Sequence, residues 1–88
     1  TEPYDIEIGD KLQRKLKKLQ NKDTQYYNAI ISKTVQIAEV PQLGKPLRGV
    51  LKEEKVHVGP FVLIYKINEN ERVVTLIELE HHDDAYRH

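Results

Sequence analysis

The spacing of apolar residues changes once along this 88-residue chain, at the segment 41–46, which holds two prolines and Gly44. Before this segment the apolar residues follow the period of an α-helix, and after it they gather in short runs rich in β-branched and aromatic residues. A chain of this length can build only one hydrophobic core, so each half has to cover the apolar face of the other. The sequence therefore predicts a single α+β domain that covers residues 1–88.

The first half contains two predicted helices joined by a short break. The apolar stripe of the first helix consists of Leu12, Leu16 and Leu19. These residues fall at positions i, i+4 and i+7, which indicates an amphipathic helix over about residues 10–20. Asp23 or Thr24 can cap a second helix, which Pro41 ends because a proline disfavours helical geometry in the residue before it. The short connection predicts an antiparallel helical hairpin.

Four short segments have the composition and length of β-strands. They are residues 4–8, 55–58, 61–67 and 72–79. The chain order is then β-α-α-β-β-β, and we expect the helical hairpin to pack on one face of a four-stranded, mainly antiparallel sheet. The last three strands form a meander, and the first strand joins the sheet after the helical crossover. The second face of the sheet is left for a ligand.

The charges sum to zero, but they are distributed unevenly along the chain. Six basic residues and no acid lie between Lys11 and Lys22, whereas residues 69–84 hold six acids and one arginine. A basic surface attracts polyanions locally even in a neutral protein, because the field follows the distribution of charge. Simple solvation of a lysine-rich helix explains the same pattern, and both interpretations stay open.

The chain has no cysteine, which excludes disulfides, thiolate metal ligands and a thiol nucleophile. This composition is typical of the reducing cytoplasm, where we expect the protein. No apolar run approaches ~18 residues, and the N-terminus lacks a basic region followed by an apolar stretch, so we expect neither a membrane span nor an uncleaved signal peptide.

Lys55 and His57 are candidates for binding chemistry because they lie two residues apart on a predicted strand. Both side chains then project from one face, and the valines beside them project from the other. If the valines face the helices, the lysine and the histidine lie on the face left for a ligand, with Arg48 and Lys52 close in sequence. Such a cluster of cations suits phosphate. Pairs of basic residues on strands also occur without any function.

The C-terminal stretch EHHDDAYRH, residues 80–88, fits a metal site, an acid–base site or a solvated tail. His81 and His82 are neighbours, so on a strand they point to opposite faces, and we expect no metal site. An imidazole exchanges protons near neutral pH, and Tyr86 adds a hydroxyl group. These groups converge if the tail packs beside the strand of His57, and otherwise the tail is solvated.

Three segments, taken in order, resemble the RelE toxins of the RelE/ParE superfamily. They are PLRG (46–49), KVHVGPFVLIYKI (55–67) and VVTLIELEHHDDAY (73–86). The resemblance implies a toxin of a type II toxin–antitoxin system that forms a hetero-oligomer with a RelB-like antitoxin. It also implies a ribosome-dependent endoribonuclease that cuts mRNA in the ribosomal A site. In that chemistry the 2′-hydroxyl of the RNA attacks the adjacent phosphate, and no metal or other cofactor takes part.

The resemblance also points to particular residues. The implied catalytic set is Arg48, Lys55, His57, His82 and Tyr86, and we expect RNA contacts from Lys45, Lys52 and His81. Val62 departs from the family pattern, which has an arginine at this place, so one phosphate-binding cation is missing. Two alternatives stay open. One is a ParE-like toxin that inhibits DNA gyrase, and the other is a member with a weakened catalytic set that acts mainly as an antitoxin-binding partner.

Overall fold

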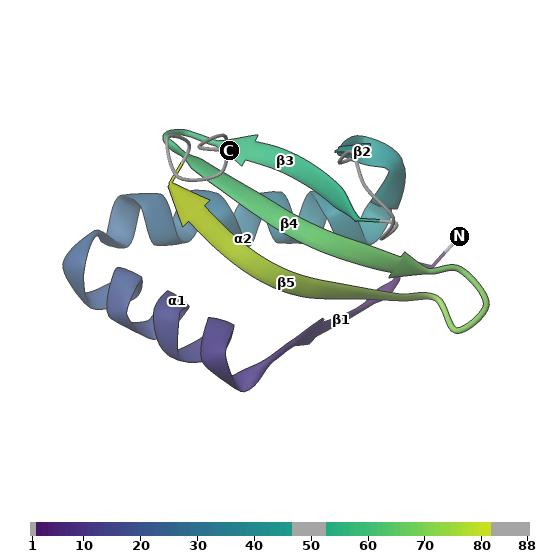
Figure 1. Ribbon diagram of the computed structural model, residues 1–88, viewed down its shortest axis with the longest axis horizontal. Helices are drawn as coiled ribbons and strands as arrows, with labels where there is room; N and C mark the ends of the chain where they lie inside the picture. The colour runs from purple at the N-terminus through teal and green to yellow at the C-terminus, as the bar shows by residue number, and fades with distance from the viewer. Residues whose placement is uncertain (1, 47–52, 82–88) are drawn as a thin grey trace.

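Two helices form one layer of the molecule, and a mixed β-sheet forms the other (Figure 1). The computed structural model describes residues 2–46 and 53–81. In chain order the elements are β1 (Asp5–Ile8), α1 (Asp10–Lys22), α2 (Thr24–Glu39), the 3-10 helix η1 (Pro41–Leu43), β2 (Lys45–Pro46), β3 (Glu54–Val58), β4 (Phe61–Asn68) and β5 (Val73–His81). The predicted β-α-α-β-β-β architecture is confirmed.

The sheet has the strand order β1-β5-β4-β3-β2. β1 runs parallel to β5, and the other neighbouring strands are antiparallel. The segment 41–46, expected to be a loop, contains η1 and then β2, a two-residue fifth strand at the edge of the sheet. A strand of two residues shows no alternation from which it can be predicted, and its proline is tolerated because the strand lies at an edge.

The helices begin and end close to where their sequence predicts. Leu12 and Leu16 are buried, so the predicted stripe of α1 does face the core. The backbone N–H of Tyr26 donates to the carboxylate of Asp23 at 3.2 Å, which caps the start of α2. α1 continues to Lys22 and is slightly longer than predicted. Within the described residues, neither helix is long and apolar enough to cross a membrane.

The core lies between the helical hairpin and the inner face of the sheet. Its buried members are Leu12, Leu16, Ile30, Ile37, Val58, Leu63, Tyr65, Val74, Leu76 and Leu79. The hydroxyl of Tyr65 donates to the Pro41 carbonyl at 2.7 Å and accepts from the Gly44 N–H at 2.9 Å. These two bonds hold residues 41–44 against the sheet. Burial raises the pKa of Tyr65, so its hydroxyl keeps the proton that it donates.

A β-bulge in β5 decides which of its residues face the core. The pairing of β4 with β5 shifts register after Ile64, and Ile77 has no Cα partner in β4. As a result both Leu76 and Leu79 are buried in the core, although three positions separate them. Strict alternation from Leu76 would turn Glu80 inward, and the bulge turns it outward instead.

Candidate functional site

The face of the sheet turned away from α1 and α2, called the outer face below, carries the candidate site. It includes Lys55 and His57 from β3, Val62, Ile64 and Lys66 from β4, and Thr75 and Glu80 from β5. Along each strand these residues alternate with residues of the core, so their side chains share one face. Cross-strand pairing arranges them in rows, and the row that crosses three strands at one end of the sheet is His57, Val62 and Glu80.

The structure brings Lys55 and His57 together on this face, as the spacing predicts. Val58 is buried in the core and Val56 packs against it, so the lysine and the histidine between them point away from the helices. His57 is exposed and Lys55 is half-buried. Their Cα atoms lie about 7 Å apart, as expected for alternate residues of a strand. That separation lets one phosphate group contact both side chains.

Val62 in β4 lies between His57 in β3 and Glu80 in β5. It pairs with His57 on one side and with Glu80 on the other, and only 1% of its surface is exposed. The position at which the family pattern has an arginine is therefore central to the outer face. A small apolar side chain fills this position here, and it supplies no charge.

Two glutamates of β5 differ in what they contact. The ammonium group of Lys15 in α1 donates to Glu78 Oε1 at 3.1 Å, and also to the carbonyl oxygen of Leu79. Burial alone would raise the pKa of Glu78, but the bonds from Lys15 and from the Leu79 N–H, together with the charges of Lys15 and Lys11, lower it. Within the described part of the chain, the side chain of Glu80 takes part in no hydrogen bond or ion pair, and Glu80 is half-buried on the outer face.

His81 lies on the other face of the sheet. It pairs in register with Phe61, and the two rings meet edge to face with their centroids 5.9 Å apart. Phe61 in turn meets the ring of Tyr26 from α2 at 5.6 Å. His81 is exposed at the end of this aromatic row, so it does not share a face with Lys55 and His57. Its contact with RNA stays a prediction, and it requires the RNA to pass around the end of the sheet.

Several predicted residues lie outside the described residues. They are Arg48, Lys52, His82 and Tyr86. Lys45 belongs to β2, where its Cα pairs with that of Lys55 in β3. The anchoring of residues 41–44 by Tyr65 fixes where this part of the chain meets the sheet.

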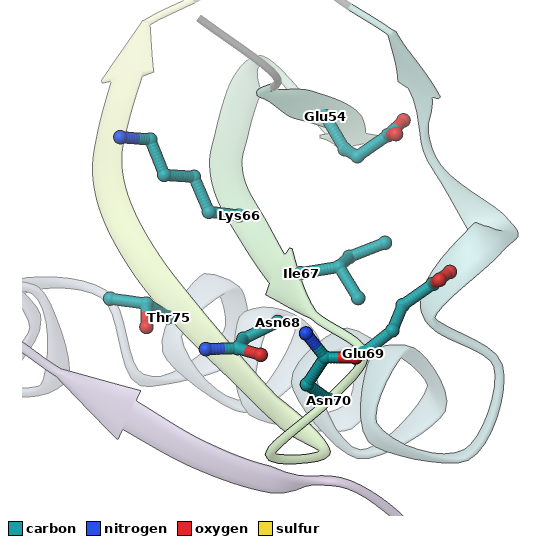
Figure 2. A pocket seen from close by; sticks show the side chains of 7 residues that line it. All are labelled: Glu54, Lys66, Ile67, Asn68, Glu69, Asn70 and Thr75. Carbon is teal, nitrogen blue, oxygen red and sulfur yellow. The ribbon is translucent and has the colours of Figure 1, made fainter.

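A hollow lies at the far end of the sheet, around the turn between β4 and β5 (Figure 2). Its lining residues are Glu54, Lys66, Ile67, Asn68, Glu69, Asn70 and Thr75. Figure 2 shows the side chain of Lys66 extending from β4 toward β5, where Thr75 is its partner in register. Lys66 is four residues from Val62, or about 13 Å along the strand, so the hollow is separate from the row of His57.

Sequence reasoning missed two charged residues of the outer face, Lys66 and Glu80. Lys66 stands out as the one charged residue of β4, which is a usable signal. Glu80 is harder to recognise, because its face depends on the bulge. The signal for the bulge is the spacing of the apolar residues Val74, Leu76 and Leu79, which changes from two to three positions.

The fold is that of the RelE toxins. The chain aligns with a structure of the toxin–antitoxin complex RelBE2 from Mycobacterium tuberculosis with a TM-score of 0.76, at 24% identity, over 90% of this chain and 98% of that one. An archaeal RelE–RelB complex from Pyrococcus horikoshii gives a TM-score of 0.74 at 16% identity, over 91% of this chain and 96% of that one. A mutant of Escherichia coli toxin RelE in the free state gives a TM-score of 0.73 at 19% identity, over 97% of this chain and 88% of that one.

Sequence comparison identifies the family. The model of the ParE toxin of type II toxin–antitoxin systems, parDE, matches residues 6–86. A candidate RelE toxin of Methanocaldococcus jannaschii, named RelE4, is 35% identical over 86 residues, which are 96% of this chain and 92% of that protein. The chain therefore belongs to the ParE toxin family of type II toxin–antitoxin systems, within the RelE/ParE superfamily.

Proposed function

We propose that this toxin is a ribosome-dependent mRNA endoribonuclease whose outer face binds the RNA backbone. The observation that carries the proposal is the placement of Lys55 and His57 on one face of β3, turned away from the helices. A cation and an imidazole within reach of one phosphate are what cleavage by the neighbouring 2′-hydroxyl needs. The relatives and structural neighbours named as RelE support the same activity.

The proposed reaction needs three contributions from the protein. The 2′-oxygen forms a bond to the adjacent phosphorus, and the bond from phosphorus to the 5′-oxygen breaks. A base takes the 2′ proton, a cation stabilises the charge on the phosphorane, and an acid protonates the departing 5′-oxygen. Lys55 offers the cation, and His57 offers a base or an acid. In this proposal Arg48, His82 and Tyr86 complete the catalytic set, and no metal ion or cofactor is needed.

The absence of an arginine at Val62 lowers the positive charge at the centre of the site. Lys55 remains in the neighbouring row, and Lys66 lies further along β4 on the same face. We propose that Lys45 and Lys52 add RNA contacts around this face. The expected consequence is cleavage that depends strongly on the lysines that remain, and therefore on salt concentration.

We propose that the toxin is neutralised by a RelB-like antitoxin in a hetero-oligomer. An acidic, amphipathic segment of such a partner would lie across the outer face or across the basic side of α1. The exposed basic residues of that side are Lys11, Arg14, Lys17, Lys18 and Lys22. Two of the structural neighbours are named as complexes of a toxin with its antitoxin, which supports such a partner. Action on translating ribosomes implies a cytoplasmic protein.

A second candidate function is inhibition of DNA gyrase. The family model that matches the chain is that of ParE toxins, which is the specific observation in its favour. Both activities belong to one superfamily, so the fold by itself does not distinguish them. In a purified assay the first activity acts on mRNA in the ribosome, and the second acts on DNA gyrase.

The decisive experiment adds the protein to a purified translation system and maps mRNA ends by primer extension. We expect cuts in phase with codons that occur only when ribosomes are present, and that are lost in His57→Ala and Tyr86→Phe. Lys33→Ala, a change on α2 in the other layer, is the matched control and keeps the wild-type pattern.

The same preparation is tested for inhibition of DNA supercoiling by gyrase. Inhibition of gyrase without mRNA cleavage would replace the proposed function by the second candidate. Binding to ribosomes or to an antitoxin without cuts in either assay would instead indicate a member with a weakened catalytic set.

A further inference from the structure

One row of the outer face joins an imidazole and a carboxylate across a small apolar residue. His57, Val62 and Glu80 are consecutive Cα partners on β3, β4 and β5. Neighbouring strands lie about 4.8 Å apart, so the Cα atoms of His57 and Glu80 are separated by about 10 Å. Both side chains project from the same face, and they stand on either side of Val62. A phosphate group bound between His57 and Glu80 would have one of them on each side.

The carboxylate of Glu80 is also available for chemistry. Glu78, two positions earlier, is held by Lys15 and by a backbone N–H, so it has a structural role. Glu80 has no such contact within the described residues, although it is half-buried. An acidic side chain on a face that binds RNA repels phosphate, so its presence beside the cations Lys55 and Lys66 calls for a reason other than affinity.

We propose that Glu80 is a catalytic residue, the general base of the RNA cleavage, and that His57 is the general acid. This inference rests on the proposed function. Glu80 takes the proton of the 2′-hydroxyl while the 2′-oxygen bonds to phosphorus. His57, as imidazolium, gives its proton to the 5′-oxygen as the bond from that oxygen to phosphorus breaks. The products are a 2′,3′-cyclic phosphate and a 5′-hydroxyl, and both side chains then exchange protons with water.

The neighbouring residues fit this assignment. In a displacement at phosphorus the attacking and leaving oxygens lie on opposite sides of the phosphorus atom, so the base and the acid have to face each other across it. Each group needs a hydrogen bond of about 2.6–3.2 Å to its oxygen, and a spacing of about 10 Å between the Cα atoms leaves room for both bonds and the phosphorane. Val62 is buried and brings no competing charge to this row, and Lys55 in the adjacent row is close enough to stabilise the phosphorane oxygens.

The test compares Glu80→Gln with wild type in the purified translation system, as single-turnover cleavage rates measured from about pH 5 to about pH 9. We expect a loss of about 10²–10⁴-fold, the range for removal of a general base, and the disappearance of the acidic limb of the pH–rate profile. Glu80→Asp should recover part of the rate. Glu71→Gln, in the turn between β4 and β5, is the matched control and keeps the wild-type rate. Circular dichroism establishes that each variant is folded.

The direction of the rate change in Glu80→Gln distinguishes a catalytic role of Glu80 from simple repulsion of RNA. If Glu80 only repels RNA, removing its charge leaves cleavage equal or makes it faster, and that result overturns the inference while the proposed function stands. If the wild-type protein does not cut mRNA at all, both the proposed function and this inference fail.

A modified substrate separates the two roles. An mRNA with a sulfur atom in place of the 5′-bridging oxygen at the cleavage site has a leaving group that needs no proton. It should restore cleavage by His57→Ala, which lacks the acid, but not by Glu80→Gln, which lacks the base. Restoration of Glu80→Gln by this substrate would overturn the assignment of Glu80 as the base.

Discussion

The two faces of the sheet are made from the same strands, and they differ in what they contribute. On the inner face, residues such as Leu63 and Tyr65 are completely buried under the helices, and among the described residues every buried side-chain polar atom has a partner. On the outer face, the alternate positions of β3, β4 and β5 hold charged and polar side chains, such as Lys55, His57 and Glu80, around the apolar Val62. Side chains alternate along a strand, so a residue that packs in the core has as its neighbour in the sequence a residue that faces the candidate site. Substitutions on the inner face should therefore affect folding, and those on the outer face should affect activity.

The largest effect is expected from placing a charge on the inner face. Leu16→Asp in α1 and Leu63→Asp in β4 should each lower the free energy of unfolding by about 3 kcal/mol or more, because each removes a buried apolar side chain and buries a carboxylate. A domain of this size has a small stability margin, so both variants should be largely unfolded. Urea unfolding followed by circular dichroism measures the effect.

The control for this prediction is Lys66→Asp, which introduces the same residue on the outer face of β4. Its free energy of unfolding should change by less than about 0.5 kcal/mol. An equal loss for Lys66→Asp and Leu63→Asp would show that the two faces do not differ as described.

A smaller effect is expected from one buried hydroxyl. Tyr65→Phe removes the donor to Pro41 and leaves the Gly44 N–H without its acceptor, at a cost of about 1–3 kcal/mol. Thermal unfolding measures the loss, and Tyr27→Phe on α2 is the matched control. If Tyr65→Phe is as stable as wild type, residues 41–44 are held by other contacts.

The turn between β3 and β4 offers a comparison of two glycines. Gly59 has a φ of +58°, and a Cβ atom there would lie 2.6 Å from the ring of Tyr26. Gly59→Ala should therefore cost about 1–2 kcal/mol. Gly9, before α1, has a φ of −66°, and a Cβ atom there would meet nothing within 4 Å, so Gly9→Ala should stay within about 0.5 kcal/mol. Equal midpoints in urea for the two variants would contradict this explanation.

The smallest effect concerns the contact between Lys15 and Glu78. The pKa of Glu78 is lowered in the folded protein, so this carboxylate stabilises the fold at pH values above its unfolded pKa, and the contribution is lost as the pH falls through the folded pKa. Both side chains are partly exposed, at 48% and 29%, so the contribution is about 0.5 kcal/mol or less. Glu78→Gln should be less stable than wild type at about pH 7 and equal to it near about pH 3. A difference that persists at the acidic pH would point to packing instead of charge.

Much of the fold was predictable because the relevant signals are local. The leucine spacing of α1, the cap at Asp23 and the β-branched runs of β3 and β4 each report on a few neighbouring residues. The shared face of Lys55 and His57 was predictable for the same reason, since it depends only on alternation within one strand.

The unpredicted features depend on contacts between distant segments. β2 exists because Lys45 and Pro46 meet β3, and two residues cannot show this on their own. The place of Glu80 on the outer face follows from the bulge at Ile77, which is defined by the pairing with β4. The same pairing places His81 next to Phe61, on the face opposite to His57. Counting along β5 therefore does not give the face of a residue beyond the point where the register shifts.

The parallel pairing of β1 with β5 has a consequence for synthesis of the toxin. Asp5 near the start of the described chain is a Cα partner of Val73, so this pair closes a very long loop, and such contacts form late in folding. During translation β1 cannot pair with β5 until β5 has left the ribosome. The row through Glu80 is then assembled only after β5 has been made, and a chain that stops before β5 cannot carry the finished outer face.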